Sequence, residues 1–393
     1  MPRRSKAKTA ASKSVTTPSR RVSSANASPV FFDLRGAGGS LGSSSSPSVN
    51  PPASSPTIDA SHSRGPPRSL VAAEDEAATN RLIIDLMDSR LRENALAHLA
   101  RRAWGFQELA VRLWFSFGTI AILLQEVLSV YPLLSPPSLT PIQSDRLCNV
   151  LTLLQCVASH QETRSLFSQA YLPFYLVVLL NQIGELRCFE RIRILTLGII
   201  AALVQVPDPR VISLLLEAEL IRPCLCAMQR GSEFSRTVAT LILKRILLDD
   251  NGLQHVCRRP DLFLSVWQAL RSVVASLSQL PSTPLLRDVI TCYLCLFKNE
   301  RSLALRQSLP RSLINGTFRY CCNDDHTRLL LQQLLDQTRL SLIAQKDHHK
   351  IQHGISTIST STVLQRLLTL ISSRVQWQTL LGMSFSHQKG ISF

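Results

Sequence analysis

The sequence predicts an all-α protein, a right-handed solenoid in which short helices stack as repeats. From about Asp75 to Leu335 the apolar residues recur at helical spacing, and the alternation typical of strands is absent. Several expected helices are apolar around most of their circumference, which indicates burial between neighbours. The same succession of helices also returns several times along the chain. These observations together favour a stack of helical repeats.

The helix expected to begin at Ser144, in the stretch "SDRLCNVLTLLQCVASHQETR" (Ser144–Arg164), illustrates one such element. Ser144 is the expected N-cap, and Asp145 lies in the first turn, where a negative charge is favourable. Apolar residues then cover most of the helix and leave a narrow polar stripe that includes Asn149 and Gln155. A helix of this kind is expected to lie buried between neighbouring helices.

Four segments share one pattern: an apolar helix, a polar turn, a short second helix, and a third helix opened by proline. Proline suits that place because the first helical N–H has no partner within the helix. The proline spacings of 50, 37 and 50 residues bracket the period of armadillo repeats. With an upstream unit from about Asn80 to Tyr131 as a cap, we expect about five or six three-helix repeats with one core and a concave groove. The prolines are Pro173, Pro223, Pro260 and Pro310.

Composition divides the chain into three parts. Residues 1–75 form a basic Ser/Pro-rich arm that is expected to be disordered, because it cannot bury enough apolar surface. Residues 76–340 are the expected repeat domain, and residues 341–393 are a C-terminal extension. The first 73 residues supply +8 of the formal net charge of +16. No apolar run reaches the roughly 18 residues of a membrane span, so no membrane partner is expected.

The arm contains two basic clusters, "RRSKAK" (Arg3–Lys8) and "SRR" (Ser19–Arg21), that resemble import signals. The expected location is therefore the cytoplasm, with the nucleus as a second compartment. A flexible basic arm also suits weak, salt-sensitive binding to RNA. A solvated tail that binds nothing specific, or a transit peptide, would have a similar composition.

No residue pattern indicates catalysis, a cofactor or a metal. The glycines of "GAGGSLG" (Gly36–Gly42) follow no strand, so they are read as linker. The strongest metal candidate is "CYLC" (Cys292–Cys295) with Cys321 and Cys322, but the surrounding "ITCYLCLF" is typical of a core helix. We therefore expect no enzyme, and a function that resides on surfaces.

Four stretches resemble one known family, the "required for cell differentiation" armadillo family, a conserved non-catalytic subunit of the Ccr-Not mRNA deadenylase complex. The resemblance runs from about Asn80 to about Leu335. The stretches are "LWFSFGTIAILLQEVLSVYP" (Leu113–Pro132), "PPSLTPIQSDRLCNVLTLLQCVASHQETR" (Pro136–Arg164), "FERIRILTLGIIAALV" (Phe189–Val204) and "GSEFSRTVATLILKRILLDDNGL" (Gly231–Leu253).

The resemblance implies a scaffold that docks on the large Not subunit and recruits regulators carrying short linear motifs to mRNA deadenylation, decay and translational repression. A second copy of the chain is a further candidate partner, which would give a homodimer. In the groove, Gly198 would let a partner approach the backbone and Val238 would form an apolar floor. Alternatively, Phe117 and Ala121 only pack the core. The implied groove residues are Phe115, Phe117, Ala121, Arg191, Gly198, Thr237 and Val238.

A second hypothesis is a module that binds single-stranded nucleic acid, RNA included, with arginines following the phosphate backbone. The same arginines could equally be solvated helix faces. They are Arg191, Arg193, Arg245 and Arg287.

The sequence departs from the family pattern at several positions. Phe115 stands where a histidine or tyrosine is usual, and Arg191 where an aromatic residue is common. An aromatic and a basic residue of a loop near the pockets for partner tryptophans in animal relatives appear here as Pro260 and Leu262, which disfavours tryptophan recognition. The segment 363–383, "VLQRLLTLISSRVQWQTLLGM", is amphipathic and predicts a helix that packs on the solenoid end or binds a partner.

Overall fold

The structure is a computed structural model that describes residues 68–106, 108–181, 187–321 and 324–340. All of the described residues belong to one compact unit. The predicted arm up to residue 67 and the predicted C-terminal extension lie outside the described residues.

Two helices begin the described chain, α1 (Arg68–Asp85) and α2 (Arg92–Arg102). The predicted boundary of the arm at residue 75 is therefore wrong, since helix starts at Arg68. Alanine and glutamate, both strong helix formers, are frequent in α1, and α1 packs against α2 and α3. Helix propensity and packing thus extend order further toward the N-terminus than the overall composition indicated.

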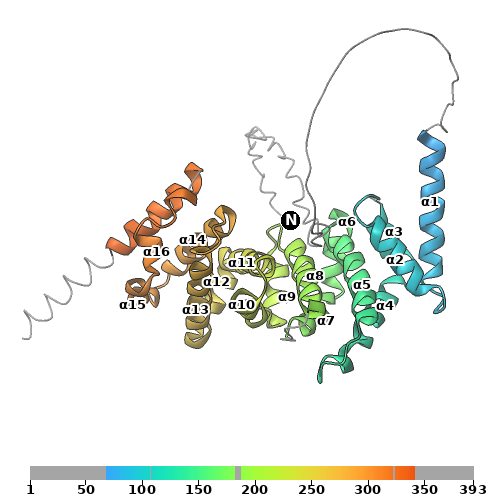
Figure 1. Ribbon diagram of the computed structural model, residues 1–393, viewed down its shortest axis with the longest axis horizontal. Helices are drawn as coiled ribbons and strands as arrows, with labels where there is room; N and C mark the ends of the chain where they lie inside the picture. The colour runs from blue at the N-terminus through green and yellow to red at the C-terminus, as the bar shows by residue number, and fades with distance from the viewer. Residues whose placement is uncertain (1–67, 107, 182–186, 322–323, 341–393) are drawn as a thin grey trace, which may run out of the picture. The chain divides into compact units, whose positions relative to one another are not determined.

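Five units of three helices follow, so the predicted armadillo-type, all-α solenoid is confirmed for the described residues. The consecutive units lie side by side in chain order (Figure 1). They are α3 (Leu109–Phe115), α4 (Thr119–Ser129) and α5 (Pro141–Ser159); α6 (Gln161–Gln169), α7 (Leu172–Leu180) and α8 (Arg187–Leu203); α9 (Pro209–Glu217), α10 (Ile221–Arg230) and α11 (Glu233–Leu248); α12 (Asp250–Arg258), α13 (Pro260–Leu277) and α14 (Thr283–Phe297); and α15 (Ser302–Leu305), α16 (Arg311–Ile314) and a helix over 325–340. Short 3-10 turns are η2 (Tyr131–Leu133), η3 (Arg306–Ser308) and η4 (Arg319–Cys321).

Equivalent helices of successive units pack on one another and form two long rows. In one row α4 packs on α7, α7 on α10, α10 on α13, and α13 on α16. In the other, α2 packs on α5, α5 on α8, α8 on α11, and α11 on α14. We call this second set, together with the helix over 325–340, the third-helix row. Stacking is required because no single unit can bury its own apolar face.

The start of α5 corrects one sequence prediction. Thr140 is the N-cap, and its side chain forms a capping box with Gln143, while Pro141 occupies the first helical position. The predicted N-cap, Ser144, lies inside the helix and is buried. The helix thus begins one turn earlier than expected.

The four prolines lie at helix starts, as predicted; the third helix of each predicted segment is the second helix of the units given above, because the predicted segments begin with the long helix that ends the preceding unit. Pro173 lies in the first two positions of α7, and Pro260 begins α13. Pro310 is the N-cap of α16, and Pro223 lies within the first turn of α10. At each place the proline costs no internal hydrogen bond, so the repeat pattern follows from local chemistry.

The core is continuous along the stack and is richest in aromatic residues where α13 meets α14. Trp267 is almost fully buried and lies edge-on to Tyr293 at a centroid distance of 5.0 Å. Phe263 and Phe297 stack on the same indole at 6.5 and 6.2 Å. Such pairs add about 0.5–1.5 kcal/mol each beyond the area they bury.

Among the described residues no single helix is long and apolar enough to cross a membrane. One pair, Leu109–Phe115 with Thr119–Leu133, meets that criterion only when the two helices are counted together, and they are bent by 90°.

Candidate partner-binding surface

The third-helix row is a candidate surface for binding a partner. It contains four of the seven groove residues predicted from the sequence and all four of the predicted phosphate-binding arginines. Arg191, Arg193 and Gly198 lie on α8, Thr237, Val238 and Arg245 on α11, and Arg287 on α14.

Ion pairs connect neighbouring helices along this row. Arg146 on α5 approaches Glu93 on α2 at 3.7 Å, and Arg191 on α8 pairs with Asp145 on α5 at 2.5 Å. Further along, Lys244 on α11 pairs with Asp288 on α14, and Arg287 pairs with Asp324 at 2.9 Å. Four positive charges of the row, those of Arg146, Arg191, Lys244 and Arg287, therefore have an acidic partner on, or directly before, a neighbouring helix.

These partners count against the nucleic-acid hypothesis. Arg191, Arg193 and Arg287 each pair with an acid, namely Asp145, Glu190 and Asp324. Arg245 is half-buried in the last turn of α11, where a positive charge complements the helix dipole. A phosphate would have to compete with existing carboxylates at three of the four positions.

Glu190 on α8 makes several polar contacts with the start of α11. Its carboxylate accepts hydrogen bonds from the Ser232 backbone N–H at 2.9 Å and the Ser235 hydroxyl at 2.6 Å, both at the start of α11. Burial acts to raise the pKa of Glu190, but these hydrogen bonds and the nearby charge of Arg193 outweigh it and hold the pKa below its ordinary value. The charged form of Glu190 therefore stabilises the contact between α8 and α11.

We predict that Glu190→Gln makes the free energy of unfolding less dependent on pH between about pH 6 and pH 3. Because the folded-state pKa is lowered, the contribution of Glu190 is fully present above its unfolded-state pKa and is lost as pH falls through the folded-state value. Urea denaturation of the wild type and the variant between pH 6 and about pH 3 measures this difference. The variant should have a lower free energy of unfolding than the wild type at pH 6, and this difference should shrink toward pH 3. A difference that stays constant with pH would show that the charge of Glu190 does not stabilise the fold.

The remaining predicted groove residues lie elsewhere. Phe115 ends α3, Phe117 follows it in the connection, and Ala121 is in the first turn of α4. Phe115 is 67% and Phe117 97% exposed, so the alternative that Phe117 packs the core is wrong. Ala121 is exposed as well. The structure thus splits the predicted groove into one group on α3 and α4 and a second group on α8 and α11.

Two predicted groove residues are not available to a partner. Val238 is fully buried, so its prediction as an apolar floor is wrong: it belongs to the core between α11 and its neighbours. Gly198 is buried beneath Gln155, whose amide nitrogen would lie 2.8 Å from a Cβ at that position. The close approach at Gly198 is therefore made by the neighbouring helix α5. Thr237, next to Val238, is partly exposed.

The departures at Pro260 and Leu262 also have structural explanations. Pro260 is the first residue of α13, and Leu262 is 4% exposed within it. Neither residue supplies the aromatic or the basic side chain of the relatives, and Leu262 is not accessible to a partner. Whether tryptophan motifs bind stays a prediction, and the structure shows why this position does not support it.

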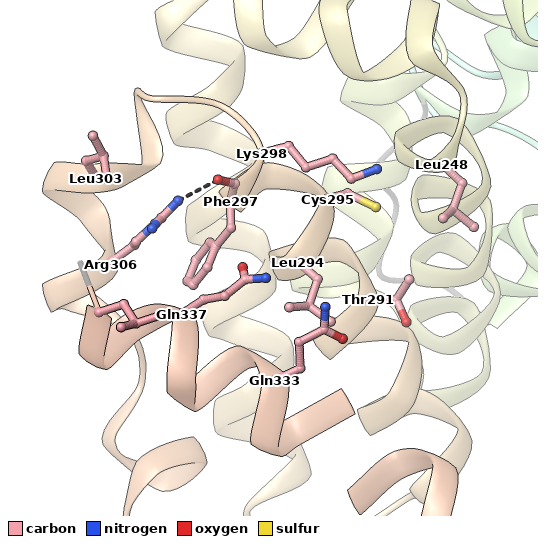
Figure 2. Close-up of a pocket in the computed structure, with 11 residues that line it drawn as sticks. Leu248, Thr291, Leu294, Cys295, Phe297, Lys298, Leu303, Arg306, Gln333 and Gln337 are labelled. Atoms are coloured by element: carbon pink, nitrogen blue, oxygen red, sulfur yellow. Dashed lines mark hydrogen bonds between the residues drawn. The ribbon is translucent and has the colours of Figure 1, made fainter. Parts of the chain in front are cut away.

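A cavity of about 620 Å³ opens beside the last described helix (Figure 2). It lies between the C-terminal halves of α14 and of 325–340, and the sequence analysis did not identify it. A second cavity of about 370 Å³ lies near the N-terminal end of the stack. There the buried carboxylate of Glu126 accepts hydrogen bonds from Arg146 at 2.7 Å and from Arg92 at 3.2 Å.

The cysteines of the metal candidate lie in the core. Cys292 and Cys295 are buried in α14, and burial raises the pKa of both thiols. Cys322 lies outside the described residues, as does the side chain of Cys321. Within the described ranges no group of three or more His, Cys, Asp or Glu residues is placed to hold a metal ion.

Stacked three-helix units define the molecule as an armadillo-type repeat protein. The model of the cell differentiation family, Rcd1-like, matches residues 82–338. The chain is 45% identical over 255 residues to "Cell differentiation protein rcd1" of Schizosaccharomyces pombe, which covers 64% of this chain and 90% of that protein. It is 42% identical over 272 residues to "Protein CAF40" of Saccharomyces cerevisiae, which covers 68% of this chain and 73% of that protein. The chain therefore belongs to the cell differentiation, Rcd1-like family, and the resemblance seen in the sequence is confirmed.

Among solved structures, the chain is similar to a designed armadillo repeat protein at 16% identity and a TM-score of 0.48. That similarity covers 66% of this chain and 98% of the designed protein.

Proposed function

We propose that the protein is a non-catalytic subunit of the Ccr-Not complex that docks on the large Not scaffold subunit and recruits regulators with short linear motifs. Family membership over residues 82–338 carries this proposal, together with the resemblance that connects the family to mRNA deadenylation. The protein would work in the cytoplasm and reach the nucleus through its basic arm.

The geometry favours recruitment of a peptide rather than of nucleic acid. A peptide can carry both an acid and a base and so satisfy both members of an ion pair that it displaces on the third-helix row, whereas a phosphate backbone satisfies only the arginine. Exposed ion pairs of this kind contribute only about 0–1 kcal/mol to stability, so a partner can displace them at little cost. Arg191 is the clearest example, because it and Asp145 are about 60% exposed.

The experiment is an affinity purification from native lysate with the full-length chain, read by mass spectrometry. We expect the Not scaffold and the deadenylase subunits to co-purify with the wild type. Arg191→Glu should retain them and lose a subset of regulators by at least about fivefold, because charge reversal opposes the ion pair that a partner would form.

A matched control exists on the other row of helices. Arg222 on α10 also pairs with an acid of the next repeat, Asp261, and both side chains are 69% exposed. Arg222→Glu should leave the partner set unchanged. If the wild type brings down no Not scaffold, the proposed function is wrong; if both variants lose the same regulators, the third-helix row is not the site.

A further inference from the structure

The cavity beside the last described helix lies where the stack has no following repeat. Its walls come from α14, from the short α15–η3 segment and from 325–340, with Leu248 at the end of α11 (Figure 2). The side chains around it are mostly apolar: Leu248, Leu294, Cys295, Phe297, Leu303 and Leu340.

Several apolar side chains at this end of the stack are exposed. Leu248 is 50% exposed, Leu303 39% and Leu340 65%. Leu329, on the same last helix, is 67% exposed. In a solenoid every repeat buries its apolar face against the next, so the terminal repeat needs a cap with a polar outer face. The described residues leave this end of the stack without such a cap.

The polar groups of the cavity do not oppose an apolar occupant. Arg306 is held against the wall: it donates a hydrogen bond to the Phe297 carbonyl, and its guanidinium lies 4.4 Å from the centre of the Phe297 ring. Lys298 is exposed and can keep its charge in water. Gln333 and Gln337 can pair with the polar edge of an approaching helix.

The chain itself contains a segment that suits this surface. In 363–383, five apolar residues recur at helical spacing and would form one stripe: Leu364, Leu367, Leu368, Ile371 and Val375. Val363, Leu370, Trp377 and Leu381 would border this stripe on one side, with Arg374 between the two sets, and the polar residues Gln365, Arg366, Thr369, Ser373 and Gln376 would lie on the opposite face. A helix with this pattern has the apolar inner face and the polar outer face that a cap requires.

The distance along the chain also favours this occupant. The family match ends at residue 338 and the last described helix at 340, both beside the cavity. Residues 341–362 connect it to the segment, and a flexible chain of that length spans about 25 Å. Such tethering gives an effective concentration in the millimolar range, so even a weak apolar contact would be occupied.

We propose that this cavity is the docking site of the chain's own segment 363–383, which binds as an amphipathic helix and caps the C-terminal end of the solenoid. The cavity accommodates several aliphatic side chains rather than a whole helix. The stripe around Ile371 therefore enters it, and the polar face of the helix stays in water. This proposal does not depend on the Ccr-Not function.

The test places the photo-crosslinker p-benzoylphenylalanine at Ile371 in the purified full-length protein and maps its products by mass spectrometry. We expect crosslinks to α14 and to 325–340 within one chain, with a yield independent of protein concentration. The same crosslinker at Ser373, on the opposite face, is the matched control and should give few such products. Leu340→Asp should reduce the Ile371 crosslinks by at least about fivefold, because it puts a charge on the apolar rim.

Each contrary result overturns the proposal. Crosslinks between two chains, with a yield that rises with concentration, would assign the cavity to a second copy. An absence of cavity crosslinks from Ile371, or equal yields from Ile371 and Ser373, would leave the cavity open to a separate partner protein. Leu340 is exposed, so Leu340→Asp should remain folded; circular dichroism checks this.

Discussion

Val238→Glu is expected to unfold the protein or to destabilise it by at least about 4 kcal/mol. Val238 is fully buried on α11, which packs against α8, α10 and α14. A glutamate there would either bury an unpaired charge or force the helices apart. Since whole domains are stable by only about 5–15 kcal/mol, this loss is a large part of the total.

Thr237→Glu is the matched control, because the neighbouring residue is partly exposed and its hydroxyl donates only to the Glu233 carbonyl on its own helix. It should change stability by less than about 1 kcal/mol. Urea denaturation followed by circular dichroism measures both variants. A folded Val238→Glu protein with near-wild-type stability would show that the site is accessible, which would restore Val238 to the groove.

A partner lost with Val238→Glu would not locate the groove, because the fold is lost as well. Arg191→Glu is the informative variant, since its side chain is exposed and its ion pair with Asp145 contributes little to stability.

The fold was predictable because its signals are local. Helical spacing of apolar residues and prolines at helix starts repeat along the chain, so the stack could be inferred without knowing any contact. The N-cap of α5 is also a local signal: Thr140, Pro141 and Gln143 carry the capping-box pattern, which the single serine at Ser144 lacks.

The surface was less predictable because it depends on helix direction and on distant partners. Where a helix is apolar around most of its circumference, the pattern does not say which side faces a neighbour. Val238 and Thr237 are adjacent, yet one is fully buried and the other partly exposed. Similarly, the pairing of Arg191 with Asp145 joins residues about one repeat apart. The sequence signal that could have indicated this pair is an acidic residue about one repeat away from an arginine.

Lys244→Met is expected to destabilise the protein by about 2–4 kcal/mol, because it leaves Asp288 without its partner in a largely buried position. The two side chains are 17% and 13% exposed, and Nζ lies 2.5 Å from Oδ1. The pair joins α11 to α14 within the third-helix row. Methionine keeps most of the aliphatic stem of lysine. The decrease in the free energy of unfolding therefore measures the loss of the charge more than the loss of packing.

The double variant Lys244→Met/Asp288→Leu separates this charge effect from a general loss of packing. Replacing both members of a buried pair by apolar residues is often neutral, so we expect the double variant to recover most of the stability lost by Lys244→Met. Arg222→Met, which breaks the exposed pair with Asp261, should cost less than about 1 kcal/mol. Denaturation midpoints at low and high salt complete the test, because a buried pair is little screened. If the double variant is as unstable as Lys244→Met, the lysine contributes through its packing, and the contact between α11 and α14 does not depend on the ion pair.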